Sequence, residues 1–525
     1  MQPRSPRGSV LNIARTVPTP VAVLIGIFIG ALLTRTFISS STPTPSWRGG
    51  HSPVYSSPRL GSTTARHTVS PPTLEQRRRV LDLLTSLSPH YTRECTRNAN
   101  PLYAQQARER YSPLIGHNPA PSKAWWMDLG LGGLDPIPQP SQEDLTYYKH
   151  RRDLSGGEHK YFFAINLYNS FDVIPDLFAT LFRVAAVLGY HNVFVSIYEN
   201  GSSDQTKALL RIFDALTRSV GMRVLIRTSQ RTRGAFNHRI EYLAEVRNAA
   251  FVPLHELRDA ENEYFDTIVF MNDILPCIDD LLELIWQSRH NNAGITCAAD
   301  YMYHDEIGAP VFYDNWVARD INGTALENAP FEAIFHHGSS SERFQRHLPV
   351  QVQSCWNGVA ILDPAPFYTP PHVRFRMARI AEGECSASEC SLICNDYWES
   401  GYGRILMVPR VKLAYDRKVF DIIHPARRNL TSIRGYVRLG GLPDNPRTDP
   451  QDRAWFGPHD RLFTEEESEP IDFVPGPEHV WCWGWDGAGD LDGPDVDPIW
   501  ERVPEKAMAA DAVKVQHDRS FKVSS

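Results

Sequence analysis

Polar residues follow three apolar runs in the middle of the chain, and their side chains could bind a phosphorylated ligand. Asn166–Asn169 follows an aromatic run, Glu199–Asp204 follows a β-branched run, and Asn272-Asp273 follows another β-branched run. Amide and carboxylate groups can hydrogen-bond to bases and ribose hydroxyls, and carboxylates can also bind metal ions. Three such segments in equivalent positions indicate one shared binding site.

The segment Glu199–Asp204 combines groups that suit contact with a nucleotide. The carboxylate of Glu199 can accept hydrogen bonds from a base or a ribose, and Gly201 permits close approach of the backbone. Ser202 supplies a hydroxyl, and Asp204 is suited to cap the helix that follows. The same residue types are also common in turns, so the segment indicates a binding site through its combination with the other two.

Asp273 is the candidate ligand for a divalent cation. Mg²⁺ and Mn²⁺ prefer hard oxygen ligands, and such a cation would neutralise the charge that builds on a departing diphosphate. His424 could complete the metal site, although a single histidine is more often an ordinary core or surface residue. Asp279 and Asp280 fall within the next predicted helix, where solvated surface is the simpler interpretation.

Alternating strands and helices must position these polar segments. Segments with helical periodicity separate apolar runs of strand length, which lie at 161–168, 192–198, 222–226 and 266–271. This alternation predicts an α/β fold with a mainly parallel sheet and crossover helices. In such sheets ligands bind at the carboxyl ends of the strands, which is where the polar segments lie.

The order of these segments resembles the nucleotide-binding half of the glycosyltransferase-A fold. That class usually shows a D-G-S-x-D-like loop, an R-N pair on a helix and an acidic D-x-D-type strand end. Here Glu199–Asp204, Arg247-Asn248 and Asn272-Asp273 take those places, and Met271 or Asn272 stands where a first Asp is usual. The resemblance implies a Rossmann-type mixed sheet with flanking helices. Asn272 would then be a neutral ligand of Mn²⁺ or Mg²⁺, or the metal would be held by Asp273 and donor phosphates. The implied donor-binding residues are Asn166, Glu199, Gly201, Ser202, Asp204, Arg247 and Asn272.

A more specific resemblance covers Tyr161 to Tyr415, about half of the chain. The segments that carry it are FYDNWVARDINGT, VQSCWNGVAILD, ECSASECSLICNDYW and GYGRILMVPRVKLAYD. They resemble the cryptococcal-type capsular α-1,3-mannosyltransferases, which form glycosyltransferase family 69. The resemblance implies a GDP-mannose donor, a glycan acceptor that contains mannose, an α-1,3 linkage and retention at the anomeric carbon.

Aromatic and acidic residues further along could bind the acceptor sugar. Carboxylates can hold sugar hydroxyls, and an aromatic face can cover the apolar side of a pyranose. A buried Trp316 beside an ion pair of Arg319 and Asp320 would explain the segment 313–320 equally well. Gly358, after Trp356 and Asn357, could mark a bulge. The candidate acceptor-binding residues are Tyr313, Trp316, Trp356 and Asn357.

The candidate catalytic carboxylates are Asp396, Glu389 and Asp314, in that order. If 388–397 is helical, Glu389 and Asp396 share a face and could both point into a cleft. A structural helix beside a disulfide is the alternative interpretation. Retention leaves two routes open, a covalent glycosyl-enzyme or front-face attack in which the leaving phosphate takes the acceptor proton. An inverting enzyme could use Asp396 as general base.

The N-terminal region predicts a membrane anchor and a spacer. Arginines precede an apolar run and no acidic residue occurs before Glu75, which favours a cytosolic N-terminus; a cleaved signal or a transit peptide is the alternative. Residues rich in Ser, Thr and Pro follow. The predicted organisation is a tail at 1–16, an anchor at 17–38, a stem at 39–73, a helical lead-in at 74–155, a catalytic domain at 156–428 and a Gly/Pro/Trp/acid-rich extension at 429–525.

Charge and cysteine content set the remaining expectations. The net charge of -7 argues against nucleic acid as a partner, and eight cysteines fit disulfides in an oxidising lumen. We therefore expect a single-pass type II protein of the Golgi or another secretory-pathway membrane. Two alternative functions remain, a transferase of another nucleotide-sugar such as UDP-xylose, and an inactive glycan-binding relative.

Overall fold

The computed structural model describes residues 73–87, 95, 101–115, 159–424, 461–482 and 499–502, with gaps at 231, 233–237, 262, 331–332, 380–383 and 385–386. All of them belong to one compact unit, Tyr55–Ser525. The predicted tail, anchor and stem lie outside the described residues, except for Thr73 at the end of the stem. Within the described ranges, every helix is too short or too polar to cross a membrane.

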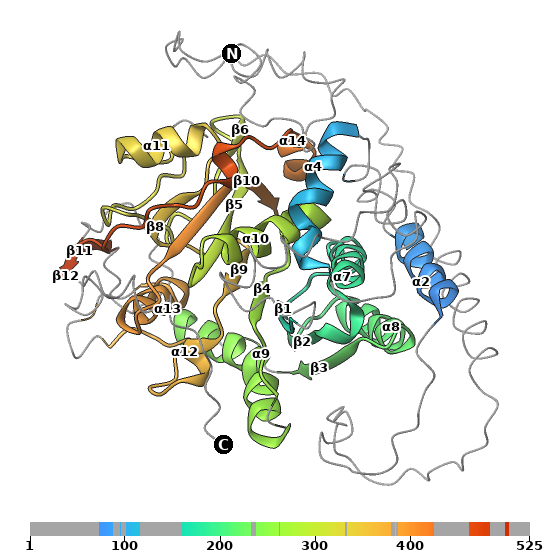
Figure 1. The fold of residues 1–525 in the computed structure, drawn as a ribbon. Helices are drawn as coiled ribbons and strands as arrows, with labels where there is room; N and C mark the ends of the chain where they lie inside the picture. Colours follow the sequence, from blue (N-terminus) through green and yellow to red (C-terminus); the bar gives the residue numbers. More distant parts are fainter. Residues whose placement is uncertain are drawn as a thin grey trace, which may run out of the picture. The chain divides into compact units, whose positions relative to one another are not determined.

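A mixed sheet forms the centre of the fold, with the strand order β3-β2-β1-β4-β9-β5-β10-β8-β7, and β6 pairs with β5 (Figure 1). The first four strands are parallel, and β9 runs antiparallel to both β4 and β5. The predicted α/β class is therefore confirmed, and the sheet is mixed beyond β4. The strands are β1 (Tyr161–Leu167), β2 (Val193–Asn200), β3 (Arg223–Ser229), β4 (Thr267–Met271), β5 (Ile295–His304), β6 (Ala309–Phe312), β7 (Arg319–Asp320), β8 (Val350–Ser354), β9 (Val359–Leu362) and β10 (Ile405–Ala414).

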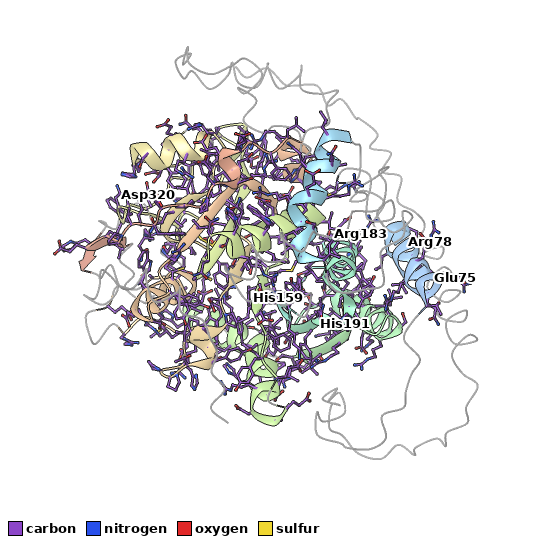
Figure 2. All side chains as sticks on the ribbon, in the orientation of Figure 1. Glu75, Arg78, His159, Arg183, His191 and Asp320 are labelled. Atoms are coloured by element: carbon purple, nitrogen blue, oxygen red, sulfur yellow. A yellow bond between two sulfur atoms is a disulfide. The ribbon has the colours of Figure 1, made fainter. Side chains whose placement is uncertain are left out.

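Helices cover both faces of this sheet, and side chains fill the space between the layers (Figures 1 and 2). Alternate residues of β1 contribute to two separate cores: Phe162 and Ala164 to one, Phe163 and Ile165 to the other. A strand buried on both faces must be apolar throughout, which explains the continuous run YFFAI. The helices are α2 (Leu74–Leu87), α4 (Pro101–Tyr111), α7 (Ile174–Leu188), α8 (Thr206–Ser219), α9 (Arg239–Glu261), α10 (Ile278–His290), α11 (Gly338–Gln345), α12 (Ala365–Tyr368), α13 (Glu389–Glu399) and α14 (Arg417–Ile423).

Short segments complete the description. A two-stranded ribbon joins β11 (His479–Cys482) to β12 (Ile499–Arg502), and the backbone of Trp481 donates to Gly323 at 2.7 Å. Single 3₁₀ turns occur at Ser112–Leu114, Tyr190–Asn192 and Glu466–Ser468.

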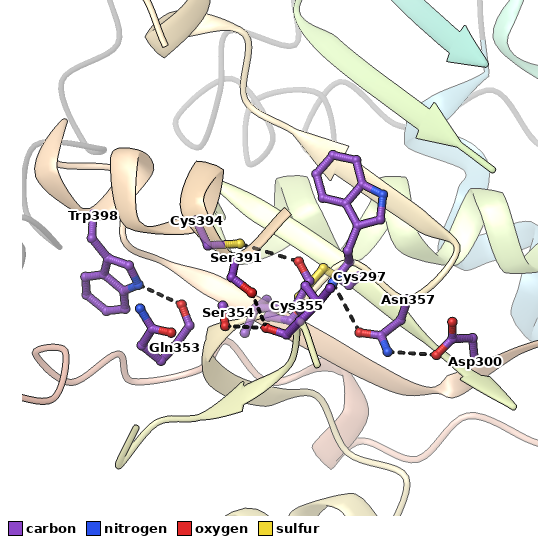
Figure 3. The surroundings of a disulfide bond; sticks show 12 residues. Cys297, Asp300, Gln353, Ser354, Cys355, Asn357, Ser391, Cys394 and Trp398 are labelled. Carbon is purple, nitrogen blue, oxygen red and sulfur yellow. Dashed lines mark hydrogen bonds between the residues drawn. A yellow bond between two sulfur atoms is a disulfide. The ribbon is translucent and has the colours of Figure 1, made fainter. Parts of the chain in front are cut away.

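Two disulfides connect distant parts of the chain. Cys95 bonds to Cys277 at the start of α10, and Cys297 of β5 bonds to Cys355 beside β8 (Figure 3). Cys390 and Cys394 on α13 are buried free thiols. The Cys394 thiol donates to the backbone carbonyl of Cys355 at 3.4 Å, so α13 lies beside the Cys297–Cys355 disulfide without being bonded through either of these two thiols. Cys385 lies outside the described residues.

Candidate functional site

Two adjoining pockets open at the carboxyl ends of β1, β2 and β4. They share one wall, which is made by Arg239, Leu243, Arg247, Asn272 and Asp273. We name the first the asparagine pocket; it is also lined by Asn166, Tyr168, Asn200 and Tyr242. We name the second the carboxylate pocket; it is also lined by Tyr313, Asp314, Trp316, Glu389, Tyr415 and Asp416.

The asparagine pocket has amide groups at its base and an aromatic ring at its mouth. The amide nitrogen of Asn166 donates to the carbonyl of Val246 at 3.0 Å, and that of Asn200 lies 3.4 Å from the hydroxyl of Tyr242. Tyr168, directly after β1, is 47% exposed. The pocket can therefore hold a polar, flat ligand, because it offers hydrogen-bonding groups and a ring face.

The loop after β2 supports this pocket from behind. Glu199 is fully buried, accepts a hydrogen bond from the Ser202 backbone, and has the Lys207 ammonium 3.7 Å away. The Ser202 hydroxyl accepts from the backbone of Asn169 at 2.9 Å. Asp204 accepts from the backbone nitrogens of Phe171 and Thr206.

The predicted nucleotide contacts of these loop residues therefore need correction. Glu199, Gly201, Ser202 and Asp204 do not line either pocket. Their polar atoms are engaged in shaping the loop, and Gly201 adopts a φ of 91° that favours glycine. Sequence reasoning assigned these side chains to a ligand, whereas in the structure they hydrogen-bond to the backbone of the loops.

Asn272 and Asp273 lie at the end of β4, in the wall between the pockets. The backbone nitrogen of Asn272 donates to the carbonyl of Gly358 at 2.9 Å. Gly358 has a φ of 83°, and a Cβ atom there would lie 2.9 Å from the Ile274 side chain. Gly358 thus supports the strand end rather than approaching a ligand.

Asp273 is the acidic group of this wall. Its carboxylate accepts a hydrogen bond from the Ser170 hydroxyl at 3.3 Å. Burial raises the pKa of Asp273 to about 6, because desolvation disfavours the charged form. A positive ligand group or a cation next to Asp273 would lower this pKa again, because it favours the charged form.

Arg247 connects the two pockets to the helix α13. Its guanidinium donates to Glu389 at 2.8 Å and to the side-chain oxygen of Asn272 at 3.2 Å. It also lies 5.1 Å from the centre of the Trp356 ring. The predicted R-N helix position is therefore at the site, and Arg247 holds one carboxylate, Glu389, at the edge of the carboxylate pocket.

The carboxylate pocket combines acidic and aromatic side chains, as predicted for Tyr313, Asp314 and Trp316. The Tyr313 ring is 42% exposed and lies 5.4 Å from the ring of Tyr415. Burial and then the charge of Asp300 raise the pKa of Asp314 to about 8. Asp314 is therefore mainly a neutral carboxyl group at pH 7, and it can donate a hydrogen bond.

Asp396, the favoured catalytic carboxylate, lies outside the carboxylate pocket. The Arg376 guanidinium donates to it at 2.7 and 3.0 Å, and also binds Glu384. Seven residues along a helix correspond to about 10 Å. Both acids lie on one face of α13, as predicted. Because they are this far apart along the helix, Glu389 in the first turn lines the pocket and Asp396 does not.

Trp356 and Asn357 do not form an acceptor surface, because both are completely buried. Trp356 packs against Phe270 and Phe375. The Asn357 amide donates to Asp300 at 2.8 Å (Figure 3). The predicted sugar contacts of these two residues are therefore wrong, and their role is to build the wall behind the pocket.

His424 does not join Asp273 in a metal site. It hydrogen-bonds to the backbone carbonyl of Lys412 at 3.0 Å and lines a separate small cavity with Asp279 and Asp280. These two acids are 6% and 4% exposed, so their interpretation as solvated surface is also wrong. Asp280 accepts from the backbone of Cys277 at 2.6 Å and caps α10.

Sequence reasoning missed Asp300, Arg239 and Tyr415. Asp300 is an acid in the middle of the apolar strand β5, and its side chain is fully buried. A buried carboxylate is unfavourable unless it is hydrogen-bonded. An isolated acid inside a strand-like apolar run was therefore the signal that could have identified it.

Comparisons with known proteins show similarity to one family over the central part of the chain. Residues 160–396 match the family described as Cryptococcal mannosyltransferase 1. The α-1,3-mannosyltransferase CMT1 of Cryptococcus neoformans var. neoformans serotype D is 37% identical over 267 residues, which are 48% of this chain and 56% of that protein. The chain thus spans just over half the length of this relative.

Solved structures also align with the chain. Residues 1–349 of Staphylococcus aureus TarS are 12% identical, cover 54% of this chain and 67% of that chain, and give a TM-score of 0.30. The mannosyltransferase PcManGT from Pyrobaculum calidifontis, in complex with GDP-Man and Mn²⁺, is 11% identical, with 70% and 77% covered and a TM-score of 0.29. The similarity that the sequence comparisons show covers residues 160–396, where the chain resembles the family described as Cryptococcal mannosyltransferase 1.

Proposed function

We propose that the chain transfers mannose from GDP-mannose to a mannose-containing glycan, and that it forms an α-1,3 linkage with retention at the anomeric carbon. The family and the named relative support the sugar and the linkage. The structural observation that carries the proposal is the shared wall between the two pockets. A transferase needs two binding spaces that meet at the reacting bond, and Arg247 and Asp273 lie at that meeting point.

The asparagine pocket is the proposed donor site. It contains about 1510 Å³ of empty space, including the part that is open to solvent, which is enough for a nucleotide-sugar. The base would lie against Tyr168 and the amides of Asn166 and Asn200. The diphosphate would then lie at the shared wall, where Arg239 and Arg247 contribute positive charge.

Asp273 fits the role of protein ligand to Mn²⁺ or Mg²⁺. These ions are commonly held by one or two carboxylates together with substrate phosphates, and among the described residues no group of three or more His, Cys, Asp or Glu could hold a metal alone. The bound cation would supply neutralisation of the charge on the departing diphosphate. Asn272 is less suited as a second ligand, because its side-chain oxygen already accepts from Arg247.

The carboxylate pocket is the proposed acceptor site. Tyr313 and Trp316 offer ring faces to a pyranose, and Asp314 and Glu389 can hold its hydroxyl groups. Glu389 is a carboxylate anchored by Arg247 at 2.8 Å, so it accepts hydrogen bonds. Asp314 can donate one. Together they would orient the acceptor hydroxyl toward the sugar at the shared wall.

A transfer assay tests the proposal. Purified full-length chain in detergent would be given GDP-mannose or UDP-xylose with an α-mannoside acceptor, in Mn²⁺ or EDTA, and the product would be analysed by mass and linkage. An α-1,3-mannosyl product from GDP-mannose, lost in EDTA, would support the donor, linkage and metal together. Transfer from UDP-xylose alone would mean that the donor is not GDP-mannose. If no sugar were transferred to any of a panel of acceptors, a glycan-binding protein without activity would be favoured.

We also propose that residues 17–38 anchor the chain in a Golgi or other secretory-pathway membrane, with 39–73 as a stem and the catalytic domain in the lumen. The two disulfides support this location, because such bonds persist in oxidising compartments. Protease treatment of intact microsomes checks it: the catalytic domain should survive until detergent is added. Digestion without detergent would place the domain on the cytosolic side.

A further inference from the structure

Asp300 is a buried acid that lies behind the carboxylate pocket without lining it. Its side chain is 0% exposed. One carboxylate oxygen accepts from the Asn357 amide at 2.8 Å and from the Asp314 backbone nitrogen at 3.3 Å. The other accepts from the Tyr415 hydroxyl at 2.9 Å. Among the described residues, no basic side chain forms an ion pair with Asp300.

The partners of Asp300 connect it directly to the pocket wall. Asp314 and Tyr415 both line the carboxylate pocket. The backbone carbonyl of Asp300 also accepts from the Tyr313 nitrogen at 3.0 Å. Three residues of the wall, from two separate chain segments, are therefore held by one residue of β5.

Asn357 fixes the orientation of this network. Its own side-chain oxygen accepts from the Trp356 backbone nitrogen at 3.1 Å, so its amide nitrogen must face Asp300 (Figure 3). Asn357 has a φ of 51°, a conformation that few residues other than Gly and Asn adopt readily. Asn therefore meets both requirements of this position, the left-handed backbone and a side-chain nitrogen that donates to Asp300.

We propose that Asp300 is a positioning residue for sugar transfer: it holds Asp314 and Tyr415 in the orientation in which they bind the acceptor. This inference rests on the proposed function of the carboxylate pocket. Asp300 lines neither pocket and would act through Asp314 and Tyr415. Its negative charge also acts on Asp314, and it is the largest contribution after burial to the raised pKa of that carboxyl group. Burial raises the pKa of Asp300 as well, while the hydrogen bonds from Asn357, Tyr415 and the Asp314 backbone favour its charged form. When Asp300 is charged it keeps Asp314 neutral, in the form that donates a hydrogen bond to a sugar hydroxyl.

Other charged and titratable groups also face Asp314. The two arginines of α9 lower its pKa, and the carboxylate of α13 raises it. Among the described residues these groups include Asp300 from β5, Arg239 and Arg247 from α9, Arg319 from β7, Glu389 and Cys390 from α13, and the neighbouring Tyr313 and Tyr415. Removing the charge of Asp300 leaves the arginines in place, so the pKa of Asp314 should fall.

The test compares Asp300→Asn with Asp320→Asn in the full-length chain. Asp320 (labelled in Figure 2) is also 0% exposed, and its carboxylate accepts from the Ser340 hydroxyl and the backbones of Ile321 and His337. It lines neither pocket, so it controls for the loss of a buried acid.

We expect Asp300→Asn to lower kcat at least 10-fold with little change in the KM for the donor. In a plot of kcat against pH, the loss of activity that follows deprotonation of Asp314 should move from near pH 8 to lower pH. Asp320→Asn should leave kcat and this pH dependence unchanged. Equal kcat losses in the two variants, or an unmoved pH dependence, would overturn the proposal. If Asp300→Asn does not fold, Tyr415→Phe removes one of the donors, and unchanged kcat there would overturn it as well.

A measurement without turnover separates this proposal from the proposed function. Asp314→Asn should raise the Tm at pH 8.5 in the wild-type chain, and by less than half as much in the Asp300→Asn background, because the two acids are coupled. Equal shifts would contradict the coupling. If the wild-type chain transfers no sugar but the shifts differ, the proposed function fails while the coupling of the two acids stands.

Discussion

Two regions of the molecule contain several buried charged side chains, and they differ in how many of these side chains form ion pairs. One is the carboxylate pocket. The other, which we name the α4–α10 cluster, lies where α4, α10, β10 and the segment after 461 meet, and consists of Arg110, Glu283, Arg410, Arg461 and Glu467. In the cluster Arg110 binds Glu283 through two hydrogen bonds of 2.7 and 2.8 Å, and Arg410 binds Glu467 at 2.8 and 2.9 Å.

Pairing distinguishes the two regions. Two basic groups of the cluster, Arg110 and Arg410, also lie over aromatic rings, and the Arg110 guanidinium is 3.6 Å from the centre of the Trp286 ring. The pKa of Glu467 is lowered below its usual range because the basic charges and hydrogen bonds outweigh burial. In the pocket, burial raises the pKa of Asp273 and Asp314. Asp273 and Asp314 therefore differ from the paired acids of the cluster, and also from Glu389 of the same pocket, which Arg247 binds at 2.8 Å. Acids that are paired serve stability, and Asp273 and Asp314 remain available to a ligand.

The largest expected effect is on stability, in the α4–α10 cluster. Glu283→Ala leaves the Arg110 guanidinium buried without its carboxylate, and breaking a buried pair in this way typically costs about 3–5 kcal/mol. Chemical denaturation should show a loss of this size, while kcat per folded molecule stays near the wild-type value. The double variant Arg110→Met/Glu283→Leu should recover much of the stability. If Glu283→Ala instead lowered kcat without lowering the stability, the cluster would act in the reaction, and the distinction between a stabilising and a ligand-binding region would be wrong.

The opposite pattern is expected for Asp273→Asn. Under the proposed function, removing this carboxylate should lower kcat about 100-fold, which corresponds to about 2.7 kcal/mol of transition-state stabilisation. The Tm should not fall, because the variant no longer buries a carboxylate. The assay would compare kcat, the response to Mn²⁺ and the Tm with those of Asp320→Asn. Near-normal turnover with an unchanged metal response would exclude Asp273 from the reaction.

Stability should also depend on pH through Asp314. Its folded pKa is about 8, above the ordinary aspartate value. The folded state therefore binds an extra proton between about pH 4 and 8, and stability is lost as the pH rises through that window. Asp314→Asn removes this loss, so its Tm should exceed that of the wild type by at least about 4 °C at pH 8.5 and by little at pH 4. A constant difference across this range would mean that Asp314 titrates normally.

The comparison also explains how much the sequence predicted. Periodicity correctly placed β1, β2, β3 and β4, because each is a local run of apolar residues. It also placed Asn272 and Asp273, which follow directly from the end of β4. Local pattern therefore suffices for residues whose position depends on one strand.

The errors concern residues whose surroundings come from distant segments. Helical spacing made Asp396 the favoured catalytic carboxylate. In the structure Asp396 binds Arg376, a residue outside α13, and does not line the pocket. Asp300 and Asn357 are 57 residues apart, and their contact depends on β9 entering the sheet between β4 and β5. No short pattern in the sequence contains this pairing.

The smallest expected effects distinguish the two pockets from each other. Tyr168 and Tyr313 are similarly exposed, at 47% and 42%, and each lines one pocket. An aromatic contact of this kind contributes about 1 kcal/mol, so each Tyr→Ala variant should raise one KM about 5-fold. Tyr168→Ala should affect the KM for GDP-mannose, and Tyr313→Ala the KM for the acceptor, with kcat nearly unchanged in both. If both variants altered the same KM, the two pockets would bind one substrate, and the division into donor and acceptor sites would have to be abandoned.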